Sequence, residues 1–257
     1  MSTCVRLTDR VALVTGGAAG QGLAHTRRLA QEGAYVLFSD INQALGEAAE
    51  AILKAEGLNV EFTVMDVANL EHWQAVKDRL QAQFGRLDIL VNNAGMIGGI
   101  EPAEGTTEAQ WNTTINVNQK SIYYSMHVLV DLLRNSAHAS VINTSSIFGL
   151  VGADGYLSYV ASKGAVTLMT KSMATSYGRY GIRVNSIHPG YIDTQMLRDE
   201  LAMLGEGAAE ATLKTIPLGR FASAEEIAPT VAFLASDDAS YITGAEILID
   251  GALLASR

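Results

Sequence analysis

The chain has 257 residues, of which 48% are hydrophobic and 18% are charged, and its formal net charge is −9. This composition is typical of a globular protein with a large core and excludes a chain that is disordered throughout. The negative net charge argues against a sequence-independent nucleic-acid binder, which needs a basic face to neutralise phosphates.

Cysteine and histidine usage narrows the chemistry further. Cys4 is the only cysteine, so the sequence forms no internal disulfide and no thiolate metal cluster. The five histidines show no H-E-x-x-H pattern, and we expect no metal site. The first residues lack the apolar core of a signal peptide, and no apolar run reaches the roughly 18 residues that span a bilayer. We therefore expect a cytoplasmic protein with no membrane partner.

Short apolar runs that predict buried strands alternate along the chain with longer stretches whose apolar spacing predicts helices. Alternating strands and helices favour an α/β fold: one domain over residues 1–257, with a Rossmann-like, doubly wound parallel sheet and helices on both faces. Ligands of such sheets bind beyond the carboxyl ends of the strands. The predicted strands cover residues 10–14, 35–39, 60–65, 89–91, 140–142, 183–187 and 246–249, and the clearest helices cover residues 22–32, 43–56, 70–84 and 158–180.

A glycine-rich segment, Thr15–Gly22, follows the first predicted strand and leads into the first predicted helix. Its pattern is T-G-x-x-x-G-x-G. Glycines allow the tight turn and let the main chain approach a pyrophosphate at the helix N-terminus, where free N–H groups favour an anion. We expect this loop to bind a dinucleotide through Gly16, Ala19, Gln21 and Gly22.

Asp40 ends the second predicted strand, eighteen residues beyond Gly22. A carboxylate here accepts hydrogen bonds from ribose hydroxyls and repels a 2′-phosphate. Neither the glycine loop nor the residues after Asp40, beginning with Ile41, supply a cation for that phosphate, so the sequence predicts NAD rather than NADP. The alternative is that Asp40 caps the following helix. After the third strand, we expect Asp66 and Val67 to frame the adenine.

Tyr159 and Lys163 are four residues apart in a predicted helix, and Ser146 lies thirteen residues before the tyrosine. Positions i and i+4 share a helix face, so the lysine ammonium is expected near the phenol. The positive charge would lower the phenol pKa from about 10 towards the operating pH, where Tyr159 exchanges a proton with an alcohol or a carbonyl. The alternative is a surface aromatic–aliphatic pair.

The segment 194–217 is the one irregular insertion. Its methionines adapt in shape and its glycines permit hinging, so we expect a mobile flap over the substrate; the alternative is an ordinary pair of surface helices. The other segments expected over the site, 96–100, 148–157 and Tyr191, are also mostly apolar. The sequence therefore predicts a bulky apolar substrate, such as an alicyclic, terpenoid, steroid or aromatic secondary alcohol or the corresponding ketone.

In their order along the chain, these motifs resemble those of the short-chain dehydrogenases/reductases in the common form of about this length. The resemblance runs nearly end to end. It rests on Thr15–Gly22, Asn92–Gly95, Ser146, Tyr159 with Lys163, Pro189 and Gly190 followed by Thr194, Ile242–Gly244, and Asp250 with Gly251.

The resemblance implies an NAD-dependent oxidoreductase that interconverts a secondary alcohol and a ketone by hydride transfer. It implies that Tyr159 is the proton donor or acceptor and that Lys163 holds the nicotinamide ribose while lowering the tyrosine pKa. Ser146 would hydrogen-bond the reacting oxygen. Ser145 is the alternative, but the spacing to Tyr159 and the following Ile147–Gly149 segment favour Ser146.

Further roles carry over by position. An asparagine of a proton relay falls at Asn118, counted from Trp111, with Asn116 as the alternative. His188 occupies a strand-end turn, and we expect a structural role for it. The remaining cofactor contacts implied by the resemblance are Asn92, Asn93, Ala94, Gly95, Pro189, Gly190, Ile192 and Thr194.

Two other functions compete with this one. A 3-oxoacyl thioester reductase uses the same catalytic residues, but Asp40 argues against its usual NADPH dependence. A non-enzymatic NAD(H) sensor would be expected to lack the tyrosine or the lysine, and both are present. Members of the family commonly form tetramers, and the matching stretches here are 159–180 and 245–257, so the resemblance implies a homotetramer.

Overall fold

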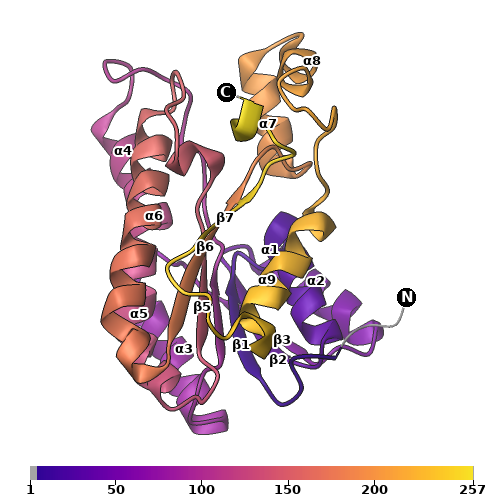
Figure 1. Ribbon diagram of the computed structural model, residues 1–257, viewed down its shortest axis with the longest axis vertical. Helices are drawn as coiled ribbons and strands as arrows, with labels where there is room; N and C mark the ends of the chain where they lie inside the picture. The colour runs from indigo at the N-terminus through magenta and orange to yellow at the C-terminus, as the bar shows by residue number, and fades with distance from the viewer. Residues whose placement is uncertain (1–4, 257) are drawn as a thin grey trace.

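The computed structural model describes residues 5–256 (Figure 1). Cys4, on which the prediction about disulfides and thiolates rests, lies outside these residues. The described chain folds around a seven-stranded parallel sheet in the order β3-β2-β1-β4-β5-β6-β7, which confirms the predicted fold class. The strands are β1 Val11–Thr15, β2 Tyr35–Asp40, β3 Val60–Val64, β4 Ile89–Asn92, β5 Ser140–Thr144, β6 Arg183–Pro189 and β7 Glu246–Ile249.

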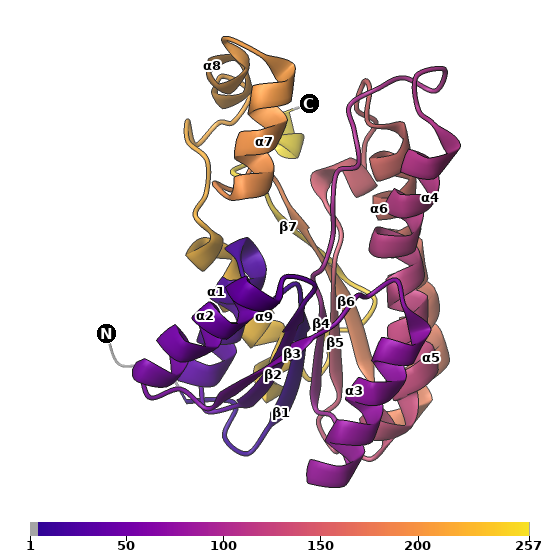
Figure 2. The same ribbon diagram turned by 180° about the vertical axis from the view of Figure 1, so that it is seen from behind.

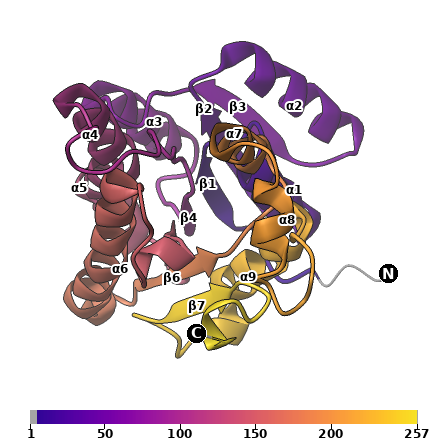
Figure 3. The ribbon, with the colours of Figure 1, turned by 90° about the horizontal axis from the view of Figure 1, so that it is seen from above.

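Helices cover both faces of the sheet, and the view from above separates the two layers (Figure 3). One layer contains α1, α2 and α9, and the other contains α3, α4, α5 and α6. The helices are α1 Gly20–Gln31, α2 Gln43–Ala55, α3 Leu70–Gln83, α4 Glu108–Ile115, α5 Ser121–Arg134, α6 Leu157–Tyr177, α7 Gln195–Leu204, α8 Ala208–Leu213 and α9 Ala224–Ala235.

Strand β1 shows why the strands are apolar along their whole length. Successive side chains of a strand point to opposite faces, and both faces of this sheet are covered. Ala12 and Val14 therefore pack in the core beneath α1, α2 and α9, whereas Val11 and Leu13 pack in the core beneath α3, α5 and α6. This double burial anchors the strand whose carboxyl end carries the glycine loop.

The strand order reverses between β1 and β4, where a crevice forms at the carboxyl ends of the strands in doubly wound sheets. Thr15 at the end of β1 fixes the loop after β4: its Oγ1 accepts hydrogen bonds from the main-chain nitrogens of Asn93 at 3.0 Å and Ala94 at 3.1 Å. Two strand ends are thereby held together at the mouth of the crevice.

Residues 194–217 form two short helices, α7 and α8, that stand apart from the two layers at the carboxyl edge of the sheet (Figure 2). Gly205 and Gly207, between these helices, have φ angles of 89° and 82°, which favour glycine. Within residues 5–256, no helix combines the length and the apolar composition that a bilayer span requires.

Candidate active site

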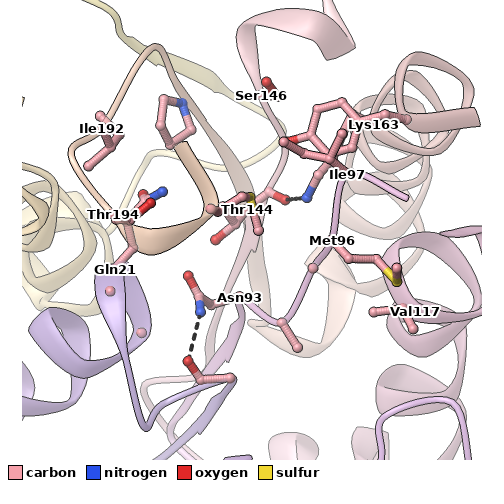
Figure 4. A pocket seen from close by; sticks show the side chains of 18 of the residues that line it. Gln21, Asn93, Met96, Ile97, Val117, Thr144, Ser146, Lys163, Ile192 and Thr194 are labelled. Atoms are coloured by element: carbon pink, nitrogen blue, oxygen red, sulfur yellow. Dashed lines mark hydrogen bonds between the residues drawn. The ribbon is translucent and has the colours of Figure 1, made fainter. Parts of the chain in front are cut away.

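A cavity of about 680 Å³ lies at the carboxyl ends of the strands (Figure 4). It brings together the predicted glycine loop, the ends of β2 to β6, the start of α6 and the helix α7. Of the residues predicted for the site, those that line this cavity are Gly16, Ala19, Gln21, Gly22, Asp40, Ile41, Asp66, Val67, Asn93, Ala94, Gly95, Ser146, Tyr159, Lys163, Pro189, Gly190, Ile192 and Thr194. Asn118 is not among them.

The glycine loop requires glycine at both Gly16 and Gly22. A Cβ on Gly22 would lie 1.9 Å from the carbonyl oxygen of Gly16, and Gly16 itself has a φ of 64°. Ala19, the N-cap of α1, makes no capping hydrogen bond through its side chain, and the first turn has no acidic residue. The positive end of this helix thus faces the cavity with unclaimed N–H groups, which suits a diphosphate.

Asp40 lies at the end of β2 and links the glycine loop to the start of α2. Its Oδ2 accepts a hydrogen bond from the main-chain nitrogen of Ala18 at 3.3 Å, and its Oδ1 accepts one from that of Asn42 at 3.0 Å. The N-cap of α2 is Asn42, whose side chain accepts from Leu45, so Asp40 is not the cap of this helix. The only cationic side chain among the described cavity-lining residues is Lys163.

Lys163 is buried on α6 and points its ammonium towards the end of β5. Its Nζ donates a hydrogen bond to the carbonyl oxygen of Thr144 at 2.8 Å, shown as a dashed line in Figure 4. The same Nζ lies 5.7 Å from the centre of the Tyr159 ring. Burial lowers the pKa of Lys163 to about 8, since a charged ammonium loses hydration there.

The pKa of Tyr159 differs from the sequence-based expectation. Burial raises it to about 12, a hydrogen bond with Ser146 acts in the opposite direction, and the charge of Glu200 raises it further. Desolvation of the phenol has the largest influence on this pKa, and a lowering of the pKa by the Lys163 charge stays a prediction.

The two neighbouring serines have different partners. The hydroxyl of Ser145 donates to the main-chain oxygen of Lys163 at 2.9 Å and lies 3.0 Å from Thr167 Oγ1, so it ties β5 to α6. The Ser146 side chain is hydrogen-bonded to the Tyr159 phenol. Its Oγ also accepts a hydrogen bond from the main-chain nitrogen of Phe148 at 3.1 Å. This geometry favours Ser146 over Ser145 as the partner of a reacting oxygen.

His188 lies behind Ser146, outside the cavity lining. Its Nδ1 is 2.9 Å from the main-chain oxygen of Ser146, and its Nε2 is 2.8 Å from Ser186 Oγ. Burial lowers the pKa of His188, which favours a neutral ring. Both ring nitrogens are engaged by neighbouring groups, in agreement with the structural role expected for this residue.

Asn118 is buried in a π-helical turn, Asn116–Lys120, between α4 and α5. Its amide accepts from the main-chain nitrogen of Met96 at 2.9 Å and donates to the Met96 oxygen at 2.8 Å and to Ser162 Oγ at 3.0 Å. The alternative, Asn116, lines the cavity. The observed contacts of Asn118 clamp the loop after β4 to α6, and a role in proton relay stays a prediction.

Gly95, in the loop after β4, lies close to the side chains of Lys163 and Asn118. A Cβ at this position would be 3.3 Å from Lys163 Nζ and 3.4 Å from Asn118 Oδ1. Asn92, by contrast, points into the sheet, where its amide donates to Asn143 Oδ1 at 2.8 Å, and it does not line the cavity. Asn93 lines the cavity instead, and its Nδ2 donates to the main-chain oxygens of Thr15 at 3.0 Å and Gly16 at 3.3 Å.

Two of the cavity-lining residues that were not predicted individually, Tyr156 and Glu200, form a hydrogen-bonded pair. Tyr156, at the start of α6, donates from its phenol to Glu200 Oε1 on α7 at 2.6 Å. Their segments were expected over the substrate, but the two residues are 44 positions apart and only the tertiary fold joins them. The sequence held one signal that could have identified Glu200: it lies three positions after Leu197, on the same apolar side of α7.

Comparisons with known proteins cover nearly the whole chain. A family model described as enoyl-(acyl carrier protein) reductase matches residues 16–253. The cyclopentanol dehydrogenase of Comamonas sp. is 41% identical over 98% of this chain and 99% of its own length. The 3-oxoacyl-[acyl-carrier-protein] reductase of Thermotoga maritima is 39% identical over 97% of this chain and 100% of its own length.

Solved structures show the same architecture. Levodione reductase superposes with a TM-score of 0.93 and 36% identity, covering 98% of this chain and 100% of that chain. A gluconate 5-dehydrogenase from Burkholderia cenocepacia, solved in complex with NADP and tartrate, has a TM-score of 0.91 and 30% identity over 98% of both chains.

Proposed function

The chain belongs to the short-chain dehydrogenase/reductase family and is an alcohol/ketone oxidoreductase, and on this premise we propose that it oxidises bulky apolar secondary alcohols to ketones, reversibly, with NAD. The observation that carries the proposal is the convergence of Tyr159, Ser146 and Lys163 on a cavity that extends to the glycine loop and Asp40.

The residues present fit a nicotinamide dinucleotide, the cofactor class that the family uses. The uncapped N-terminus of α1 would hold the diphosphate, Asp40 would accept hydrogen bonds from the adenosine ribose, and Lys163 would hold the nicotinamide ribose. Asp66 and Val67 would frame the adenine. When bound, the nicotinamide supplies the hydride acceptor for oxidation or the hydride donor for reduction.

The protein's own groups handle the proton and the charge on the substrate oxygen. In alcohol oxidation Tyr159 acts as a phenolate and accepts the hydroxyl proton; in ketone reduction the neutral phenol donates it. The Ser146 hydroxyl donates a hydrogen bond to the reacting oxygen as its charge changes. His188, bonded to the main chain of Ser146, holds that serine in place.

Support for NAD comes from charge. Asp40 would repel a 2′-phosphate, and no arginine or lysine lines the described cavity near β2 to compensate. The gluconate 5-dehydrogenase with NADP shows that a related fold accepts the phosphorylated cofactor. The choice of NAD therefore rests on Asp40 and on the lack of a compensating cation beside it in the described cavity lining.

Support for an apolar substrate comes from the wall beside Tyr159. The ring of Phe148 lies 5.3 Å from that of Tyr156, 6.5 Å from that of Tyr159 and 6.3 Å from that of Tyr191, measured between centroids. Aromatic walls of this kind bind apolar ring systems. The similarity to a cyclopentanol dehydrogenase supports cyclic alcohols in particular.

The test is the initial rate of reduced-cofactor formation at alkaline pH with NAD or NADP, across cyclopentanol, cyclohexanol and larger terpene, steroid and aryl secondary alcohols. We expect kcat/KM with NAD to exceed that with NADP by at least about tenfold, equivalent to ~1.4 kcal/mol of discrimination. Turnover that requires NADP would refute the assignment of Asp40.

A 3-oxoacyl thioester reductase is the second candidate, because the Thermotoga maritima relative bears that name. The same Tyr159 and Ser146 would serve its chemistry. It is distinguished by NADPH-dependent reduction of a 3-oxoacyl thioester that is faster than oxidation of any alcohol in the panel. We also propose a homotetramer of this chain, as the family resemblance implies.

A further inference from the structure

A carboxylate lies at the catalytic end of a cavity that is otherwise lined there mainly by apolar and aromatic groups. Glu200 projects from α7, lines the cavity and is only 7% exposed. Its charge is close enough to raise the pKa of Tyr159. Two other acidic residues line the described cavity, in the other half of the sheet: Asp40 ends β2, and Asp66 follows β3.

The surroundings of Glu200 do not neutralise it. Within residues 5–256, no lysine, arginine or histidine forms an ion pair with this carboxylate. Its Oε1 accepts a hydrogen bond from the phenol of Tyr156 at 2.6 Å. Burial accordingly raises the pKa of Glu200, and the Tyr156 hydrogen bond opposes that rise.

A buried carboxylate without a cation is costly, since one phenol replaces only part of its lost hydration. Such groups concentrate in sites where they meet a ligand. The position of Glu200 fits a ligand-binding role, because the helix that carries it covers the cavity and its partner lies three residues before Tyr159. Both residues of the pair line the cavity.

We propose that Glu200 and Tyr156 form a polar subsite that binds a second hydrogen-bond donor, a hydroxyl or an ammonium group, on a secondary-alcohol substrate. The inference rests on the proposed function and narrows it. The preferred substrates become cyclic or aromatic alcohols with a donor group remote from the reacting carbinol. A carboxylate oxygen accepts from such a group, whereas it offers no donor to a second ketone.

A purely mechanical role would use the same hydrogen bond differently. If the pair served only to hold α7 against the start of α6, its loss would slow every substrate alike. A substrate-binding role predicts instead that the loss depends on the second donor. The ratio of the kcat/KM values of two substrates, measured on the same enzyme variant, distinguishes these two roles.

The experiment compares kcat/KM for cyclohexanol, the three positional cyclohexanediols and the aminocyclohexanols with NAD, in the full-length enzyme. Wild type is set beside Glu200→Leu, Glu200→Gln, Tyr156→Phe and the control Asp199→Asn. Asp199 is an exposed neighbour on α7 that lies outside the cavity lining. Thermal unfolding and NADH binding establish that each variant is folded.

In wild type we expect the best diol to exceed cyclohexanol by about tenfold or more in kcat/KM. Glu200→Leu should reduce that ratio to about two, the value expected from the two equivalent hydroxyls alone, while Asp199→Asn keeps it. Glu200→Gln retains an acceptor for hydroxyls but loses the charge. In this variant the kcat/KM preference for aminocyclohexanols over cyclohexanol should largely disappear, whereas more of the preference for diols should remain. Tyr156→Phe should reduce both preferences.

Two results would overturn the subsite. One is wild type showing no preference for any diol or amino alcohol over cyclohexanol. The other is Glu200→Leu lowering kcat/KM equally for all substrates, which would assign the pair to holding α7. Failure of the proposed function gives a different result, because no alcohol in the panel, cyclohexanol included, would then be oxidised. That result would also refute the subsite.

Discussion

The phenol of Tyr159 is subject to opposing influences on its pKa. Burial and the Glu200 charge raise the pKa, and the Ser146 hydrogen bond lowers it. Oxidation of an alcohol requires phenolate, so a raised pKa means that the oxidation rate increases with pH through the neutral and alkaline range. Ketone reduction requires the neutral phenol and does not gain from alkaline pH.

Glu200→Gln is expected to move the alkaline limb of the oxidation profile to lower pH. Removing a negative charge near Tyr159 stabilises the phenolate, so the pKa falls and the same rate is reached at a lower pH. The measurement is kcat/KM for cyclopentanol against pH, with Asp199→Asn as the matched charge-removal control. A limb that stays in place, or moves to higher pH, would contradict the influence of Glu200 on the catalytic tyrosine.

Asp40→Ser is expected to relax cofactor choice. Without the carboxylate the 2′-phosphate meets no fixed negative charge at the end of β2, so the NADP-to-NAD ratio of kcat/KM should rise by about tenfold or more. Glu47→Gln, on the exposed side of α2, removes a charge nearby without touching the cavity and should leave the ratio as in wild type. An unchanged ratio in Asp40→Ser would remove the basis for NAD.

Strands and helices were most predictable from the sequence where a single local signal decides the structure. β1 and the glycine loop were predictable because doubly buried strands are apolar throughout and because a Cβ has no place at Gly22. The predicted strands and helices recur in the structure with end points shifted by a few residues. The catalytic helix α6 begins within one residue of its predicted start.

Other features depend on contacts that no local pattern encodes. The π-helical turn that carries Asn118 is joined to the Met96 main chain and to Ser162, residues far away in sequence. The pairing of Tyr156 with Glu200 requires α7 to fold back over the start of α6. The pKa of Tyr159 depends on burial, which the i, i+4 spacing with Lys163 does not report.

Helix α1 contains a buried histidine that the proposed chemistry does not use. His25 is fully buried, and within the described chain neither ring nitrogen has a hydrogen-bond partner. Burial lowers its pKa to about 3. The folded state therefore keeps the ring neutral at pH values where the unfolded chain, with a pKa near the ordinary value of about 6.5, is protonated.

His25→Leu is expected to make folding less sensitive to acid. A lowered folded-state pKa contributes stability above about pH 6.5 that is lost as the pH falls towards 3, and by pH 5 the loss is ~2 kcal/mol. Leu29 already buries an apolar side chain one turn later, so leucine continues that face. Urea unfolding at pH 7 and pH 5 measures the difference. An equally steep decline in wild type and variant would show that His25 does not titrate on unfolding.

Large apolar side chains remain exposed on the surface of the single chain. Leu168 on α6 is 67% exposed, Tyr123 on α5 is 50% exposed, and Tyr241 before β7 is fully exposed. Exposed apolar residues on the long helices and beside the edge strand are consistent with self-association. Leu168 lies within the stretch 159–180, and Tyr241 lies just before the stretch 245–257, which the family resemblance associates with tetramer formation.

Leu168→Glu is expected to weaken the assembly, because a carboxylate would be buried against a second copy of the chain. Light scattering coupled to size exclusion should give about four times the 27.3 kDa chain mass for wild type and a smaller mass for the variant. Lys77→Glu, on α3, tests whether any added charge has this effect. A wild-type mass of one chain would refute the homotetramer.

The most direct test of Tyr159 as the acid/base is the rate of NADH formation from cyclopentanol by wild type and Tyr159→Phe. Both rates are measured at saturating NAD, and NADH binding is measured on both proteins. We predict that the variant binds NADH within a few-fold of wild type while kcat falls by about a thousandfold or more, since the proton acceptor is removed and the fold is kept. A variant that binds NADH and oxidises the alcohol at a rate near that of wild type would contradict the assignment of Tyr159 as the acid/base.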